Sequence, residues 1–146
     1  MGPTAPRHSR NPWTDRDVAR HWDRVADIYV EANERVSDTH VQRFREAVRS
    51  LDLAPGCRVL NVTSRDCEAQ DYVAATATGV SVVHAEISAG LIRVAAALRP
   101  ALPQVRIPSY SRLPFQDRAF DRILSLETLE HVAEPFAFLR ELHRVS

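Results

Sequence analysis

Residues 58–68 carry the side chains whose types and spacing first suggest chemistry. Val59, Leu60 and Val62 predict a short buried strand, and a helix is predicted from Glu68 onward. A loop that joins a strand to a helix is a common site for nucleotide cofactors, because the helix N-terminus presents backbone N–H groups without partners. This segment therefore suggests a cofactor site, although it lacks the glycines that such loops normally contain.

One acidic residue stands at the distance that such a site requires. Glu86 ends the next predicted strand, about 20 residues beyond the loop, where dinucleotide-binding domains place an acid that accepts hydrogen bonds from ribose. Glu86 is therefore the leading candidate for a binding residue. The structural alternative is a solvated carboxylate that caps the helix predicted near Ser88.

Two amphipathic helices are predicted before these residues. The first begins at Asp15, and its apolar face consists of Val18, Trp22, Val25 and Tyr29. The second begins at Asp38, a plausible N-cap, and its apolar face consists of Val41, Phe44, Val48 and Leu51. The first helix must dock on another part of the fold, and both helices precede the first predicted strand.

The rest of the chain alternates between strands and helices. Strands are predicted at 80–86, 104–107 and 121–126, and a helix capped by Ser88 runs to Pro100. A last helix begins near Pro135, and its predicted buried stripe is Phe136, Leu139 and Leu142. This alternation predicts an α/β fold with a parallel sheet and helices on both faces.

Composition limits the function classes. The chain has 146 residues, 45% of them hydrophobic, which fits one domain with its own core. Nineteen basic residues balance nineteen acidic ones, so binding to nucleic acid or to an anionic membrane by bulk charge is not expected. All the basic residues are arginine, which excludes lysine nucleophiles. We expect residues 1–14 to form a flexible tail and 15–146 a domain.

Several other sites are not expected from the sequence. Cys57 and Cys67 bracket the first strand and would be held too far apart for a disulfide. Histidine and cysteine show no paired ligand spacing, so no metal site is predicted. No apolar run predicts a membrane span and no signal peptide is recognised, so a cytoplasmic protein is the default expectation.

The C-terminal third carries a more specific pattern. It consists of Leu-Pro-Phe-Gln-Asp at 113–117, Phe-Asp-Arg-Ile at 120–123, Leu-Glu-His at 129–131 and Glu-Leu-His-Arg-Val at 141–145. These segments resemble the class I S-adenosylmethionine-dependent methyltransferases, in particular the small-molecule branch called type 11. The resemblance extends over roughly residues 22–146. It implies a Rossmann-like sheet and S-adenosylmethionine as the cofactor.

The resemblance assigns roles to the loop after the first strand. Asn61 stands where the family usually has an acid, and Thr63, Arg65 and Cys67 stand where it has three alternating glycines. A residue with a Cβ pays roughly 1 kcal/mol or more for a positive φ there, so weaker cofactor binding is expected. Thr63 and Ser64 could compensate with hydroxyl hydrogen bonds. Arg65 could pair with the cofactor's carboxylate, or it could fill the cavity or point to solvent.

Further cofactor contacts are implied on the other strands. Glu86 would hold both ribose hydroxyls, and Ile87 would pack on the adenine face unless it serves only the core. Ser109 stands where the family commonly has an aspartate near the adenine amino group. Ser125 and Glu127, at the end of the fourth strand, would face the methionine end or the acceptor unless they are purely structural.

His131 is the candidate catalytic residue. In the Leu-Glu-His segment, a neutral imidazole could accept the proton of an acceptor hydroxyl or amine. Methyl transfer depends mainly on in-line positioning, so a base is dispensable in principle. Tyr29 matches a tyrosine that often closes over the cofactor in this family, and core packing is the alternative role.

Two functions remain open at this level. The family sheet has seven strands and this chain supplies the first four, which leaves the fourth strand as an open edge that favours a homo-oligomer or a partner chain. The chain could be part of a longer sequence, a natural half-domain or a degraded relative. It would either transfer a methyl group to a small-molecule acceptor, or serve as an inactive methyltransferase-like scaffold that pairs with a partner.

Overall fold

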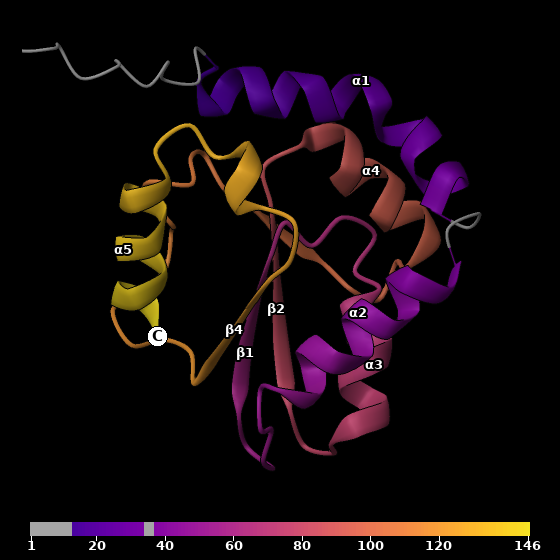
Figure 1. Cartoon of the computed structure of the whole chain (residues 1–146), viewed down its shortest axis with the longest axis vertical. Helices are drawn as coiled ribbons and strands as arrows, with labels where there is room; N and C mark the ends of the chain where they lie inside the picture. Colours follow the sequence, from indigo (N-terminus) through magenta and orange to yellow (C-terminus); the bar gives the residue numbers. More distant parts are fainter. Residues whose placement is uncertain (1–12, 34–36) are drawn as a thin grey trace, which may run out of the picture.

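The computed structural model describes residues 13–33 and 37–146 (Figure 1). In chain order, the elements are α1 (Asp15–Asn33), α2 (Ser37–Arg49), β1 (Arg58–Val62), α3 (Ala69–Thr76), β2 (Ser81–Glu86), α4 (Ala89–Leu98), β3 (Gln104–Arg106), β4 (Arg122–Ser125), the 3₁₀ helix η1 (Leu129–His131) and α5 (Pro135–Val145). The predicted strands and helices are all present, with ends that shift by one or two residues.

The described strands form one parallel sheet in the order β3-β2-β1-β4. This confirms the predicted Rossmann-like fold, in which β1 is central and the chain crosses over between neighbouring strands. Val59, Leu60 and Val62 of β1 are fully buried, as expected for a strand covered on both faces. The carboxyl ends of β1, β2 and β4 all point to the same side of the sheet.

Each face of the sheet has its own core. On one face, Val59 of β1 and Leu124 of β4 pack with Phe44 of α2 and Val73 of α3. On the other face, Leu60 and Ala85 pack with the long loop 107–121 and with Phe138 of α5. Figure 1 shows α5 and the α2–α3 pair on opposite sides of the strands.

The orientation of α5 differs from the prediction. Phe136 is 77% exposed and Leu139 is 46% exposed, so the predicted stripe through Phe136 and Leu139 is wrong. The buried residues are Phe138 and Val145, spaced by two turns. Both stripes have helical periodicity, and the sequence alone does not choose between them. The choice is made by loop 107–121, because Tyr110 packs edge to face against Phe138.

Helix α1 is fixed at its start and along its length. Thr14 and Asp17 exchange hydrogen bonds at its N-terminus, so Thr14, within the predicted tail 1–14, caps α1. Residues 1–12 of that tail lie outside the described residues. Further along, Asp23 Oδ1 accepts hydrogen bonds from Ser88 Oγ (2.7 Å) and Gly90 N (2.8 Å). Helix α1 is thereby docked on the N-terminus of α4.

Gly90 explains how closely α1 and α4 approach each other. A Cβ built on Gly90 would lie 2.9 Å from Cα of Asp23 and 3.1 Å from Cβ of Ala26. Only glycine fits there without moving the helices apart. Ser88 caps α4 as predicted, since its hydroxyl accepts the hydrogen bond from Leu91 N at 3.0 Å.

Candidate cofactor site

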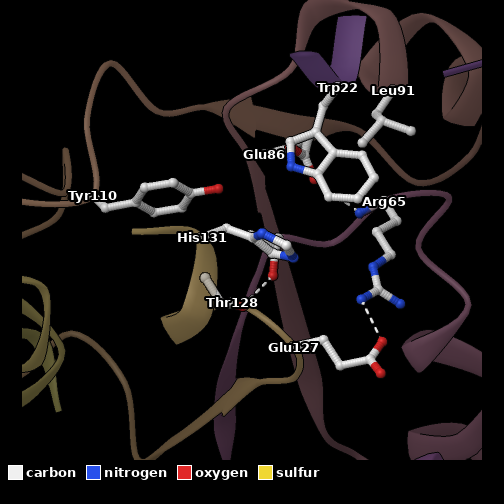
Figure 2. Close-up of a pocket in the computed structure, with 9 residues that line it drawn as sticks. Trp22, Arg65, Glu86, Leu91, Tyr110, Glu127, Thr128 and His131 are labelled. Carbon is white, nitrogen blue, oxygen red and sulfur yellow. Dashed lines mark hydrogen bonds and ion pairs between the residues drawn. The ribbon is translucent and has the colours of Figure 1, made fainter. Parts of the chain in front are cut away.

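A pocket lies beyond the carboxyl ends of β1, β2 and β4, where open α/β sheets bind ligands (Figure 2). Its walls come from α1, the β1–α3 loop, the end of β2, α4, loop 107–121 and the segment after β4. They consist of Trp22, Thr63, Arg65, Glu86, Leu91, Tyr110, Glu127, Thr128 and His131. Residues far apart in the sequence, from Trp22 on α1 to His131 after β4, thus line the same pocket.

The pocket is narrow in this structure. About 320 Å³ of space between its walls is free of protein atoms, part of it open to solvent, but only about 20 Å³ admits the centre of a water molecule. Sites for small molecules typically enclose about 300–1,000 Å³. A nucleoside could therefore enter only after side chains of the wall have moved.

The loop after β1 has the backbone of a glycine loop without glycine. Thr63, Arg65 and Cys67 have φ of 56°, 51° and 65°, the left-handed region that glycine adopts most easily. Each such residue costs roughly 1–2 kcal/mol. The loop is held in this shape from outside, because Gln104 Nε2 donates to Ser64 Oγ and to the carbonyl oxygen of Arg65, both at 2.7 Å.

Glu86 is buried beneath this loop, with 1% of its surface exposed. Its Oε2 accepts from Arg65 N at 3.0 Å, and its Oε1 accepts from the backbone N–H groups of Ile87 (2.8 Å) and Ser88 (3.0 Å). Burial raises the pKa of Glu86, and these three N–H groups partly oppose that rise. A carboxylate has about four acceptor positions, so one, on Oε2, is left for a ligand. That position can accept one ribose hydroxyl, whereas the predicted contact involves two.

Arg65 is the buried cation of the pocket. Its Nη2 donates to Glu127 Oε2 at 2.9 Å, and its guanidinium lies over the ring of Tyr29, 5.4 Å from the centroid. Burial acts to lower the pKa of Arg65, but Tyr29, Glu127 and Glu68 outweigh it and the pKa is raised. The guanidinium therefore remains charged. Arg65 is buried in the pocket wall and does not point to solvent, and its pairing with the cofactor's carboxylate remains a prediction.

The opposite wall of the pocket is aromatic. The ring of His131 meets that of Trp22 edge to face, with 5.4 Å between centroids. Burial, together with the charges of Glu86 and Asp15, raises the pKa of Tyr110, so its hydroxyl stays protonated. Figure 2 shows Tyr110, His131 and Trp22 turned toward the same space.

Several predicted binding residues do not line the pocket. Asn61 and its neighbour on β2, His84, form a buried hydrogen bond of 3.2 Å between Asn61 Nδ2 and His84 Nδ1. Ser64 is held by Gln104, and Ile87 is buried in the core beside Glu86. These three residues shape the site from behind, and a direct contact with cofactor remains a prediction for each.

Ser109 and Ser125 also lie away from the pocket walls. Ser109 Oγ donates to Asp15 Oδ2 at 2.5 Å, and Asp15 also accepts from Tyr110 N at 2.9 Å. An aspartate from α1 therefore stands beside the position where the family places one after β3. Ser125 is the last residue of β4, paired in register with Val62 of β1.

Sequence reasoning did not assign four of the wall residues, namely Trp22, Leu91, Tyr110 and Thr128. Trp22 and Leu91 belonged to apolar helix stripes, which predict core packing equally well. Tyr110 follows Ser109, where a ligand contact was expected, so its position was the available signal. Thr128 carries no local signal, and its hydroxyl lies 2.5 Å from that of Thr63.

Residues 13–33 and 37–146 contain no group of three or more His, Cys, Asp and Glu side chains that could hold a metal ion. Cys57 and Cys67 are both free. Among the same residues, no helix combines the length and apolar character needed to span a bilayer.

Comparison with known proteins agrees with this fold. Residues 60–146 match the model of a methyltransferase domain family. The demethylmenaquinone methyltransferase of Mycolicibacterium paratuberculosis is 35% identical over 138 residues, which cover 94% of this chain and 56% of that protein. The chain therefore spans about half the length of the curated relative that it matches.

Solved structures show the same fold at lower identity. The methyltransferase in a complex with the Trm112 methyltransferase activator of Haloferax volcanii has a TM-score of 0.72 and 20% identity, covering 85% of this chain and 54% of its own. The cyclase SpnF has a TM-score of 0.73 and 20% identity, covering 91% and 56%.

The parallel sheet, with a pocket at its carboxyl edge, is a Rossmann-like fold, and solved methyltransferase structures share this fold. With the match over residues 60–146, this chain belongs to the methyltransferase domain family, and the predicted resemblance to type 11 S-adenosylmethionine-dependent methyltransferases is confirmed.

Proposed function

We propose that this protein transfers a methyl group from S-adenosylmethionine to a small-molecule acceptor. The observation that carries the proposal is Glu86, which ends β2 beneath a loop whose backbone keeps three left-handed positions. Family membership supports the same reading. When bound, S-adenosylmethionine supplies the methyl group as part of a sulfonium, and the protein supplies binding, orientation and exclusion of water.

The groups that line the pocket fit the parts of such a cofactor. Glu86 Oε2 retains one acceptor position for a ribose hydroxyl. Trp22 and Tyr110 offer aromatic surface, and a ring face can attract a sulfonium cation. Because the open volume is small, binding requires a shift of wall side chains.

The acceptor would enter beside His131. Its imidazole is exposed and contacts Trp22, so it can take a proton from an acceptor hydroxyl or amine. The relatives that match this chain are named demethylmenaquinone methyltransferases, which makes demethylmenaquinone the first acceptor to test.

The proposal is tested by calorimetric titration of S-adenosylmethionine into the purified chain. We expect micromolar binding that Glu86→Gln weakens at least tenfold, since the amide nitrogen that replaces one carboxylate oxygen only donates and cannot accept a hydrogen bond from a backbone N–H or from ribose. Glu134→Gln, on the exposed residue before α5, is the matched control and should bind like the wild type. Should Glu86→Gln not fold, the 2′-deoxy and 3′-deoxy analogues of S-adenosylhomocysteine test the same contact in the wild type. We expect removal of one hydroxyl to weaken binding markedly and removal of the other to matter little.

An inactive scaffold is the second candidate function. It is favoured by Arg65, which occupies the pocket from a position where the family has glycine, and by β4, which lies at one edge of the described sheet. A well-folded sample that binds no S-adenosylmethionine at millimolar concentration would contradict the enzyme proposal. A partner chain that pairs with the β4 edge would then be the object to find.

A further inference from the structure

Arg65 is a buried charge whose hydrogen-bonding capacity is only partly used. Its residue surface is 9% exposed, and its Nη1 is buried with no hydrogen-bond partner among the described residues. A guanidinium has five N–H donors, and leaving them unpaired away from water is costly. Such a group is normally paired with an anion, either from the protein or from a ligand.

The Arg65 side chain is nevertheless firmly placed. Glu127 accepts a hydrogen bond from its Nη2, and the ring of Tyr29 lies under the guanidinium. Glu127 is itself held by an ion pair with Arg43 of α2. Burial raises the pKa of Glu127, but the hydrogen bond from Arg65 and the charges of Arg65 and Arg43 outweigh this and hold the pKa below its ordinary value. The guanidinium groups of Arg65 and Arg43 thus share the carboxylate of Glu127, and the charge of Glu68 also acts on Arg65.

The position of the cluster within the site matters as much as its charge. Arg65 and Glu127 line the same pocket as Glu86, and Figure 2 shows the guanidinium extended from the loop toward Glu127, away from Glu86. A ligand whose ribose meets Glu86 would therefore meet positive charge at another point of the wall. S-Adenosylmethionine carries one carboxylate, at its amino-acid end, which is remote from the ribose hydroxyls.

We propose that Arg65 is the anion-recognition group of the pocket and binds the carboxylate of the cofactor's amino-acid end. This inference rests on the proposed function and specifies how the site selects its ligand. Glu127 is a positioning residue that holds the guanidinium in place. The arginine would replace, with a charged hydrogen bond, the close backbone contact that glycine provides in other loops.

The test compares two nucleosides that differ at the amino-acid end. S-Adenosylhomocysteine has the carboxylate, and 5′-methylthioadenosine lacks the whole amino-acid group. We expect the wild type to prefer S-adenosylhomocysteine, and Arg65→Met to lose roughly 10- to 100-fold of that preference, because charged hydrogen bonds contribute about 1.5–3 kcal/mol. Methionine retains the Cβ and an unbranched apolar chain but lacks the guanidinium group and its charge. Arg140→Met, on the exposed face of α5, is the matched control and should keep the preference.

The possible outcomes separate this inference from the proposed function. If both nucleosides bind Arg65→Met more tightly by the same factor, Arg65 only occupies space and the inference is wrong, while the cofactor site stands. If a folded wild type binds neither nucleoside, the proposed function itself fails. Should Arg65→Met not fold, the carboxamide of S-adenosylhomocysteine gives the answer in the wild type, where we expect at least tenfold weaker binding than for the carboxylate. Equal binding of amide and acid would overturn the inference.

Discussion

Two regions of this molecule, residues 63–67 and residues 113–145, correspond to parts of one family pattern and behave in opposite ways. The first departs from the pattern at all three glycine positions, yet its backbone keeps the left-handed conformation at each of them. The second follows the pattern closely, and its matching residues bond mainly to one another. The two regions are about 40–50 residues apart in sequence and are joined at the pocket by the contact between Thr63 and Thr128.

In region 113–145, hydrogen bonds join several residues of the family pattern to one another. Arg144 donates to the carbonyl oxygens of Leu113 (3.0 Å) and Phe115 (2.8 Å) and to the carboxylate of Asp117 (2.8 Å). Glu141 Oε2 accepts from Leu113 N at 2.8 Å. The hydrogen bond from Arg144 lowers the pKa of Glu141. Helix α5 is thereby attached to the loop that covers one face of the sheet.

The difference shows what a match to the family pattern, or a departure from it, indicates in each region. Within region 113–145, the hydrogen bonds of Arg144 and Glu141 attach α5 to residues 113–117, so this part of the match indicates the fold and says little about a ligand. Region 63–67 holds strained backbone and a buried cation with an unused donor, features that persist only where the surrounding structure imposes them. Departures from the pattern in this loop are therefore the better guide to function.

The largest effect is expected from breaking region 113–145. Arg144→Ala removes hydrogen bonds to two carbonyl oxygens and two carboxylates, and we expect the free energy of unfolding to fall by about 3 kcal/mol. Urea denaturation measures this change. Arg140→Ala on the same helix is exposed and should change stability by less than about 0.5 kcal/mol. Equal effects of the two substitutions would mean that the hydrogen bonds of Arg144 do not hold the region together.

A pH experiment examines the buried pair Asn61 and His84, which lies behind loop 63–67. Burial, with a smaller contribution from Arg99, lowers the pKa of His84 from 6.5 to about 4. The unfolded chain therefore binds a proton on His84 between pH 6.5 and pH 4 while the folded chain does not, so stability is lost as pH falls through this window. We expect a loss of about 2 kcal/mol between pH 7.5 and pH 5 from this residue.

The contribution of His84 must be separated from that of Glu86, whose raised pKa favours the folded state as pH falls. His84→Gln removes the titration and retains an acceptor for Asn61. The difference in unfolding free energy between wild type and His84→Gln, measured by urea denaturation at both pH values, isolates the histidine. A difference that does not change with pH would show that His84 titrates normally in the folded protein.

The smallest effect is expected from relieving backbone strain, by substitution with glycine, at one position in each region. Arg118, in region 113–145, has φ of 54° and an exposed side chain. Arg118→Gly should stabilise the protein by about 0.5–1 kcal/mol, because glycine relieves the strain and loses some of that gain to chain entropy. Thr63→Gly relieves the same strain but loses the hydroxyl contact with Thr128, so we expect no net gain. Thermal unfolding monitored by circular dichroism distinguishes the two variants. A gain at Thr63 as large as that at Arg118 would mean that the hydroxyl contact contributes nothing.

Local sequence patterns predicted the elements and much of the fold. The run Val59, Leu60 and Val62 identified β1, and the position of Glu86 at the end of β2 followed from spacing alone. The choice of α5 face and the hydrogen bond between Asn61 and His84 could not be predicted in this way. Both depend on which distant segment packs against them, and periodicity within an element contains no information about that segment.

The pocket shows the same limit. Thr63, Arg65, Glu86 and His131 were named from the sequence and do line one space, whereas Trp22 and Tyr110 were not assigned to it. The named residues lie at strand ends and in a motif. The missed ones reach the pocket through the docking of α1 on α4 and of loop 107–121 on the sheet, which are tertiary arrangements.

The position of Trp22 also means that its fluorescence can report events in the pocket. The chain has two tryptophans, and Trp22 is the one that lines the pocket, with its indole against the imidazole of His131. Displacement of that indole by a ligand would change its emission, and protonation of the imidazole would quench it. A Trp13→Phe variant would leave a single fluorophore, so that entry of any compound into the pocket could be followed in real time without a label.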